Sequence, residues 1–192
     1  MQLHLGPKPY AEHFDPTGWT EVEIPPRWAS VVLSLAMTFL VGALLLGLIC
    51  LLVPRSVTLR GYSHWQLAVI FVLTIPGHEL IHALLQPGLG KQTIFGFWPR
   101  RLVFYAFYSG PRTRARTLVG AIGPFLILSV LPVLAAAALD FQGWQVWAVV
   151  LVNGCASSND LLGFFFVLWK IPAGAEVIGQ RRKGYWRHPA AG

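Results

Sequence analysis

Two histidines and a glutamate at close spacing are the residues of this chain most able to do chemistry. They occur in the stretch His78-Glu79-Leu80-Ile81-His82. On a helix, His78 and His82 lie one turn apart on one face, so both imidazoles can bind one Zn²⁺ while Glu79 acts on a water molecule as general base. The pattern predicts a zinc site of the metalloprotease type.

A five-residue pattern with two free positions also arises by chance, and the competing interpretation is a structural hydrogen-bonded cluster or a proton relay. The location of the motif favours the zinc site, because the motif lies inside a long apolar segment. Ionisable residues are costly in such a segment and usually face a cavity, a partner or an ion.

Composition indicates a membrane protein. Of the 192 residues, 55% are hydrophobic and 12% are charged, whereas a soluble domain carries about 25% charged residues. The net charge of +7 does not indicate a nucleic-acid partner, because the Lys and Arg residues lie in the connectors between apolar segments. Cys50 and Cys155 each lie in an apolar segment, so no disulfide framework is expected.

Four apolar segments have the roughly twenty residues that a helix needs to cross the hydrocarbon core of a bilayer. They cover residues 29–53, 65–86, 118–139 and 144–169. The sequence therefore predicts an all-α membrane protein with four transmembrane helices, forming a single polytopic domain over residues 1–192.

The distribution of basic residues predicts the orientation in the membrane. Only Arg55 and Arg60, two of the 15 Lys and Arg residues, lie in the connectors on one predicted side. Because cytoplasmic connectors are enriched in Lys and Arg, the other side is the cytoplasmic one. We expect a cytoplasmic N-terminal segment (1–28), a membrane core (29–169) and a cytoplasmic basic tail (170–192), in what is best interpreted as a bacterial plasma membrane.

A catalytic zinc needs a third protein ligand, and the predicted topology separates four candidates. Asp140 falls in an external connector, and Glu176 and His188 lie in the tail, which would have to fold back. Asp160 lies about 15 Å from the cytoplasmic border and His78 about 12 Å from it, at 1.5 Å per helical residue. Asp160 is the predicted ligand; the alternative is a structural carboxylic acid bonded to a neighbouring helix.

Polar residues around Asp160 form a stripe on the fourth predicted helix. Asn153, Ser157 and Asp160 recur at the spacing i, i+4 and i+7. Asn153 lies too near the external side to be a ligand, whereas Ser157 or Asn159 could orient Asp160 from the second shell of the site.

The third predicted helix begins with Gly120, Gly123 and Pro124 at a depth similar to that of the motif. These residues either allow helices to approach closely around the site or reflect ordinary packing in membranes.

The connector between the second and third helices, residues 91–116, predicts a short interfacial β-hairpin or re-entrant loop. Its apolar runs, 93–98 and 102–108, flank Pro99-Arg100-Arg101. A free strand edge there could bind a substrate segment by strand addition. The competing interpretation is that the arginines anchor the loop to anionic headgroups. Tyr105 or Tyr108 could donate a hydrogen bond to a developing oxyanion. Because aromatic residues are common at a membrane border, neither is included in the predicted site.

These residues resemble those of a family of small bacterial membrane proteins described as "putative zincin peptidases", which look like reduced relatives of the site-2 proteases. The similarity rests on Gly77 to His82, Gly123-Pro124-Phe125, Ser157 to Leu161, and Ile171 to Ala175. The resemblance implies metal ligation by His78, His82 and Asp160, and a catalytic role for Glu79. In the larger site-2 proteases, Gly follows the aspartate where this chain has Leu161, which affects the expected substrate more than metal binding.

We therefore expect a Zn²⁺-dependent intramembrane metalloprotease that cleaves peptide bonds in or near transmembrane segments. Its partners would be a membrane protein or peptide substrate and the lipid bilayer. One alternative is a catalytically silent zinc-binding scaffold. A metal or proton transporter is the other, but it would require a polar route through both leaflets, and the external halves of the helices offer little beyond Asn153.

Overall fold

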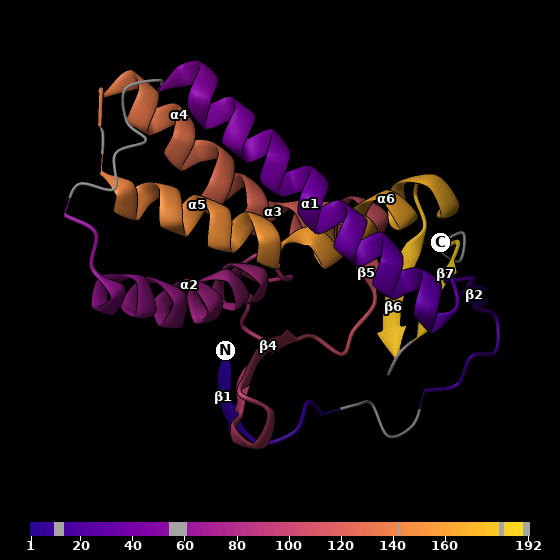
Figure 1. The fold of residues 1–192 in the computed structure, drawn as a ribbon. Coiled ribbons are helices and arrows are strands. Elements are labelled where there is room, and N and C mark those ends of the chain that lie inside the picture. Colours follow the sequence, from indigo (N-terminus) through magenta and orange to yellow (C-terminus); the bar gives the residue numbers. More distant parts are fainter. Residues whose placement is uncertain (10–13, 54–60, 142, 181–182, 190–192) are drawn as a thin grey trace.

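The computed structural model describes residues 1–9, 14–53, 61–141, 143–180 and 183–189 (Figure 1). Arg55, Arg60, Arg181 and Arg182, which entered the predicted topology, lie outside the described residues. The helices are α1 (Arg27–Leu52), α2 (His64–Leu84), α3 (Arg114–Phe125), α4 (Leu131–Ala138), α5 (Trp144–Ala156) and α6 (Ser158–Lys170), with a 3₁₀ turn at Pro99–Arg101 and a π-helical segment at Leu126–Val130. The strands are β1 (Gln2–Leu5), β2 (Thr20–Val22), β3 (Ile94–Trp98), β4 (Val103–Phe107), β5 (Arg112–Thr113), β6 (Glu176–Gln180) and β7 (Lys183–Arg187).

The strands form two sheets, and the predicted all-α class is therefore wrong: the fold is mixed α/β. One sheet has the order β1-β3-β4, and the other has the order β2-β7-β6-β5. The N-terminal segment contributes one strand to each sheet, and the tail contributes β6 and β7. Segments expected only to flank the helices thus pair with distant parts of the chain.

The hairpin predicted between the second and third helices is present. Strands β3 and β4 pair antiparallel from Ile94 opposite Phe107 to Trp98 opposite Val103. Gly96 lies opposite Tyr105, and a Cβ atom at position 96 would collide with the tyrosine ring. The glycine thus leaves the space in which that ring packs.

Three helical stretches are long and apolar enough to cross a bilayer: α1, α2 and the continuous stretch 114–138. Large apolar side chains remain exposed along them, including Phe39 and Trp65 at 76% exposure each, as expected for surfaces that contact lipid rather than water. The fourth predicted helix is divided. α5 and α6 meet at Ser157 with a bend of 48°, and they make a fourth span only if the bent pair is counted as one.

The larger of two buried hydrophobic clusters lies mainly between α1, α4 and α5. Val41, Leu45 and Ile49 of α1 pack in one cluster with Trp147 and Val150 of α5. Their spacing of four residues places the α1 side chains on one face, and the opposite faces of α1 stay exposed.

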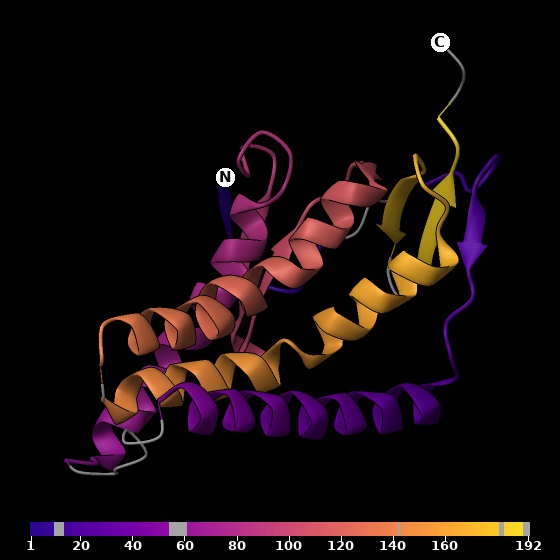
Figure 2. The same cartoon turned by 90° about the horizontal axis from the view of Figure 1, so that it is seen from above.

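The two sheets lie away from the end of the helical layer at which α1 ends and α2 begins (Figures 1 and 2). Strands β3 and β4 contact α2, and β5 leads directly into α3. The sheets therefore bring the N-terminal segment, the 91–116 connector and the tail to the region where α2 ends.

Candidate metal centre

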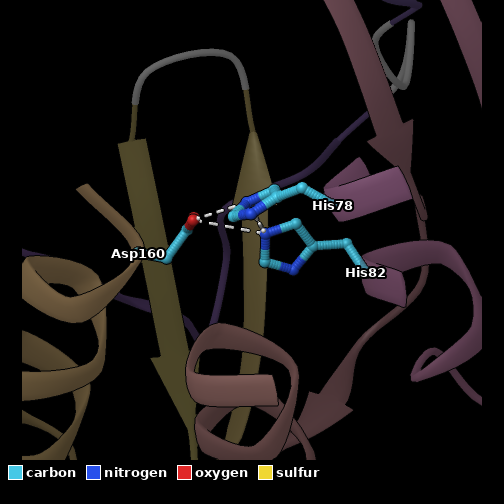
Figure 3. Close-up of side chains that lie close together, drawn as sticks. All are labelled: His78, His82 and Asp160. Carbon is cyan, nitrogen blue, oxygen red and sulfur yellow. Dashed lines mark hydrogen bonds and ion pairs between the residues drawn. The ribbon is translucent and has the colours of Figure 1, made fainter. Parts of the chain in front are cut away.

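His78 and His82 project from α2, which is helical through the whole motif as predicted. Their Nε2 atoms are 3.1 Å apart. His78 is 5% exposed. The two rings therefore share one face of the helix and approach a common point (Figure 3).

Asp160 reaches this point from α6. Its Oδ2 atom lies 3.0 Å from Nε2 of His78 and 3.3 Å from Nε2 of His82. The bend at Ser157 places Asp160 in the first turn of α6, where the helix dipole stabilises a carboxylate. The predicted convergence of the three residues is present in the structure (Figure 3).

The three groups fit zinc in both chemistry and spacing. Two imidazole nitrogens and one carboxylate oxygen form a set that catalytic zinc sites use. Ligand bonds of 2.0–2.1 Å in tetrahedral directions separate the ligand atoms by about 3.3 Å, close to the distances of 3.0, 3.1 and 3.3 Å found here.

The second nitrogen of each ring faces a hydrogen-bond acceptor. Nδ1 of His78 is 2.9 Å from Oδ1 of Asn153, and Nδ1 of His82 is 2.8 Å from the carbonyl oxygen of Gly120. Because each acceptor requires a proton on Nδ1, the Nε2 lone pairs are left free to bind a cation.

The Asn153 amide is held in the orientation that presents its oxygen to His78. Its Nδ2 group donates to the carbonyl of Pro124 at 3.0 Å and to Oγ of Ser129 at 2.8 Å. All of these partners are buried. Asn153 thus belongs to the site, although this residue was predicted from the sequence to lie too near the external side to be a ligand. Its position in the polar stripe with Ser157 and Asp160 was the sequence feature that pointed to the site.

Pro124 explains why the Gly120 carbonyl is available to His82. In an α-helix, that carbonyl would accept from the N–H four residues later, and position 124 has none. The next segment is π-helical, with the N–H of Leu131 bonded to the carbonyl of Leu126, and such segments are frequent at functional sites. The four-residue spacing of Gly120 and Pro124 therefore indicates, from the sequence alone, a helical carbonyl without its usual donor.

Glu79 faces the hairpin. Its Oε2 atom accepts a hydrogen bond of 2.9 Å from the backbone N–H of Ala106 in β4. This bond places strand β4 against the residue predicted to act as general base.

The other residues considered from the sequence have different surroundings. Glu176 accepts two hydrogen bonds from Arg187, and His188 packs against Trp186. Asp140 lies in the turn after α4. Among the residues that the structure describes, the cluster able to hold a metal comprises His78, His82 and Asp160 and includes none of these three.

The expectation that Ser157 or Asn159 orients Asp160 is not met by their described contacts. The hydroxyl of Ser157 donates to the carbonyl of Asn153, and Oδ1 of Asn159 accepts from Ser34. The orienting contacts found in the structure are instead those of Asn153 with His78 and of the Gly120 carbonyl with His82.

The fold and the site together define a zincin-like class: an HExxH helix with a distant aspartate at the same point. Residues 69–175 match the family described as "putative zincin peptidase", and since this is more than half of the chain, the protein belongs to that family. Membership suggests a zinc metallopeptidase. No curated protein and no solved structure matches this chain.

Proposed function

We propose that this protein is a zinc-dependent intramembrane metalloprotease that hydrolyses peptide bonds in or near transmembrane segments of its substrate. The observation that carries the proposal is the convergence of Nε2 of His78, Nε2 of His82 and Oδ2 of Asp160 within 4.8 Å. The orientation of both Nδ1 groups toward acceptors supports metal binding over a purely structural cluster.

The proposed chemistry divides between the metal and the chain. Zinc, when bound by His78, His82 and Asp160, supplies Lewis-acid polarisation of water and of a peptide carbonyl. Glu79 accepts a proton from the attacking water and returns it to the leaving amine. The N–H of Ala106 holds the Glu79 carboxylate at the site.

Cleavage at the membrane is supported by the helix that carries the motif. α2 is apolar enough to span a bilayer, and His78 lies fourteen residues after its first residue, His64. The sequence resemblance to site-2 proteases agrees with this placement. Water would reach the site from the side of the two sheets, which the distribution of basic residues assigns to the cytoplasm.

Strand β4 is the proposed guide for the substrate backbone. It lies at the edge of its three-stranded sheet, and the N–H of Ala106 points away from β3 toward Glu79. A substrate segment that pairs with this edge would be unwound and held beside the catalytic glutamate.

The decisive variant is Glu79→Gln, which removes the base and keeps the volume. We expect one zinc per chain by elemental analysis and at least a hundred-fold loss of cleavage, since general bases contribute about 10²–10⁴-fold. Comparison of membrane proteomes from cells carrying the two forms should reveal uncleaved substrate in the variant.

Glu23→Gln is the matched control, because Glu23 is exposed and lies before α1. It should retain both zinc and cleavage. An unchanged proteome and an unchanged cellular phenotype in Glu79→Gln would overturn the protease and favour a zinc-binding scaffold.

A further inference from the structure

A small polar cavity of about 120 Å³ lies beside the candidate metal centre. It is bounded by the N-terminal segment, the end of α2, strand β4 and strand β5. The polar side chains that line it are Lys8, Gln86, Tyr108 and Arg112, and Ala106, Phe107 and Gly179 complete the lining. None of the described lining residues is acidic.

Of the two cations of this cavity, Arg112 has a buried donor without a partner among the described residues. Nη1 of Arg112 donates to Oε1 of Gln86 at 3.3 Å, but the buried Nε–H of Arg112 has no acceptor among the described residues. The ammonium of Lys8 lies 5.5 Å from the centre of the Phe107 ring. A buried N–H without an acceptor is costly, and an anion in the cavity would satisfy it.

Arg112 is half-buried, whereas Lys8 is exposed, and the pKa of each is lowered. Removal from water lowers the pKa of Arg112 and is also the largest cause that lowers the pKa of Lys8. The positive charge of Arg112 lowers the pKa of Lys8 further, whereas the carboxylate of Glu79 acts on it in the opposite direction. Partial burial of Arg112 and the proximity of the two cations both oppose the charged forms, and a bound anion would counter both.

The cavity adjoins the groups proposed for catalysis. Ala106 lines it and donates its N–H to Glu79. Gln86 lies one turn after His82 and donates from Nε2 to the His82 carbonyl at 3.3 Å. A group in the cavity would therefore belong to a residue close to the scissile bond.

The size of the cavity restricts what it can bind. Sites for whole small molecules measure about 300–1,000 Å³, so this one accommodates a single functional group. A guanidinium binds a carboxylate through paired hydrogen bonds. We infer that the cavity is a specificity subsite, resting on the proposed protease function, in which Arg112 and Lys8 bind a carboxylate of the substrate.

Lipid phosphate is the competing occupant, and the surroundings disfavour it. The cavity opens at the exposed Lys8, but Arg112 is half-buried and its partner Gln86 is only 7% exposed. Arg100 and Arg101, by contrast, are exposed at the tip of the hairpin, where headgroups are accessible.

Binding tests the subsite without relying on catalysis. Fluorescent apolar peptides with amidated C-termini, each with one Glu or an isosteric Gln at successive positions, are titrated onto Glu79→Gln protein in phosphatidylcholine nanodiscs. At one position, we expect the Glu peptide to bind about ten-fold or more tightly than the Gln peptide. A third set with a free C-terminus and no Glu tells whether the carboxylate is that of a side chain or of the chain end.

Adding Arg112→Gln or Lys8→Gln to the Glu79→Gln protein should reduce this preference to less than about three-fold while leaving the Gln peptide bound as before. The matched control is Arg27→Gln, an exposed residue at the start of α1, which should keep the preference. Absence of any preference, or equal weakening of both peptides by Arg112→Gln, would overturn the subsite. Loss of phosphatidylglycerol binding in Arg112→Gln without a change in peptide preference would also overturn it and assign the cavity to lipid.

Cleavage by protein that retains Glu79 separates the two proposals. If the peptides bind with the carboxylate preference but none is cleaved, the subsite stands and the protease fails. If peptides are cleaved with no carboxylate preference, the protease stands and the subsite fails.

Discussion

At the scale of single residues, the candidate site depends on which nitrogen of each histidine carries a proton. Asn153 and Gly120 supply acceptors to the two Nδ1 atoms at 2.9 and 2.8 Å. Neither acceptor lies on α2, so two other helices determine how the α2 histidines present the Nε2 atoms that we propose bind the metal. The site is therefore preorganised for a cation by residues outside the HExxH motif.

Replacing Asn153 by Leu tests this arrangement. Leucine has a similar size but cannot accept from His78, and it also leaves Ser129 and the Pro124 carbonyl without their donor. We expect zinc affinity, measured by competition with a chelator, to fall about 10–100-fold.

Asn159→Leu is the comparison for that variant, because Asn159 bonds Ser34 and lies outside the site. Its zinc affinity should match that of the unmodified protein. Equal affinities in both variants would mean that Asn153 does not orient His78 for metal binding.

At the scale of elements, a break in a helix supplies a ligand or an acceptor to the site in two places. The bend between α5 and α6 puts Asp160 in a first turn. Pro124 within α3 leaves the Gly120 carbonyl without its usual helical donor. At Pro124 the imidazole of His82 takes the place of the missing helical donor, whereas the bend at Ser157 serves to position Asp160.

Pro124→Ala restores an N–H that can bond the Gly120 carbonyl within the helix. The carbonyl would then be shared between that donor and His82, so we expect zinc affinity to fall roughly ten-fold. The thermal unfolding temperature of the metal-free protein should not fall, because the variant gains a helical hydrogen bond. Chelator competition and a thermal scan on the same preparation measure both quantities.

Pro132→Ala provides the control, since Pro132 lies at the start of α4, away from the histidines. It should bind zinc normally. If Pro124→Ala binds zinc as tightly as Pro132→Ala does, the missing N–H is not what makes the carbonyl available.

The elements differ in how far the sequence predicts them. α1 and α2 were predicted within two residues at each end, because an apolar stretch of about twenty residues needs only local composition to be recognised. The break at Ser157 was not, since Asn153, Ser157 and Asp160 also fit one continuous helix. The convergence of His78 and Asp160 could be predicted because both positions follow from counting residues along helices.

At the scale of the whole molecule, the sheets are what hydropathy could not predict. β1 has four residues and pairs in parallel with β3, about ninety positions later. β2 has three residues and pairs with β7 near the other end of the chain. Strands this short carry little pattern, and their register comes from partners that local sequence does not identify.

The sheets also have a consequence for topology, because they bring the N-terminal segment, the hairpin connector and the tail to one region of the molecule (Figure 1). These segments cannot lie on opposite sides of a bilayer. The excess of Lys and Arg in them predicts that this region is cytoplasmic. The turn after α4, with Phe141 at 49% exposure, should then face the outside.

Single-cysteine proteins test this orientation. Cys50 and Cys155 are both free and exposed, so they are first replaced by alanine, and Lys91→Cys or Phe141→Cys is then added. In intact cells, a membrane-impermeant maleimide should label Phe141→Cys, whereas Lys91→Cys should be labelled only after permeabilisation. The reverse pattern would put Glu79 and its water supply on the external side, and labelling of both from one side would rule out four crossings. Because Ala106, Arg112 and the metal centre lie with the 91–116 connector, the same result decides from which compartment a substrate reaches β4.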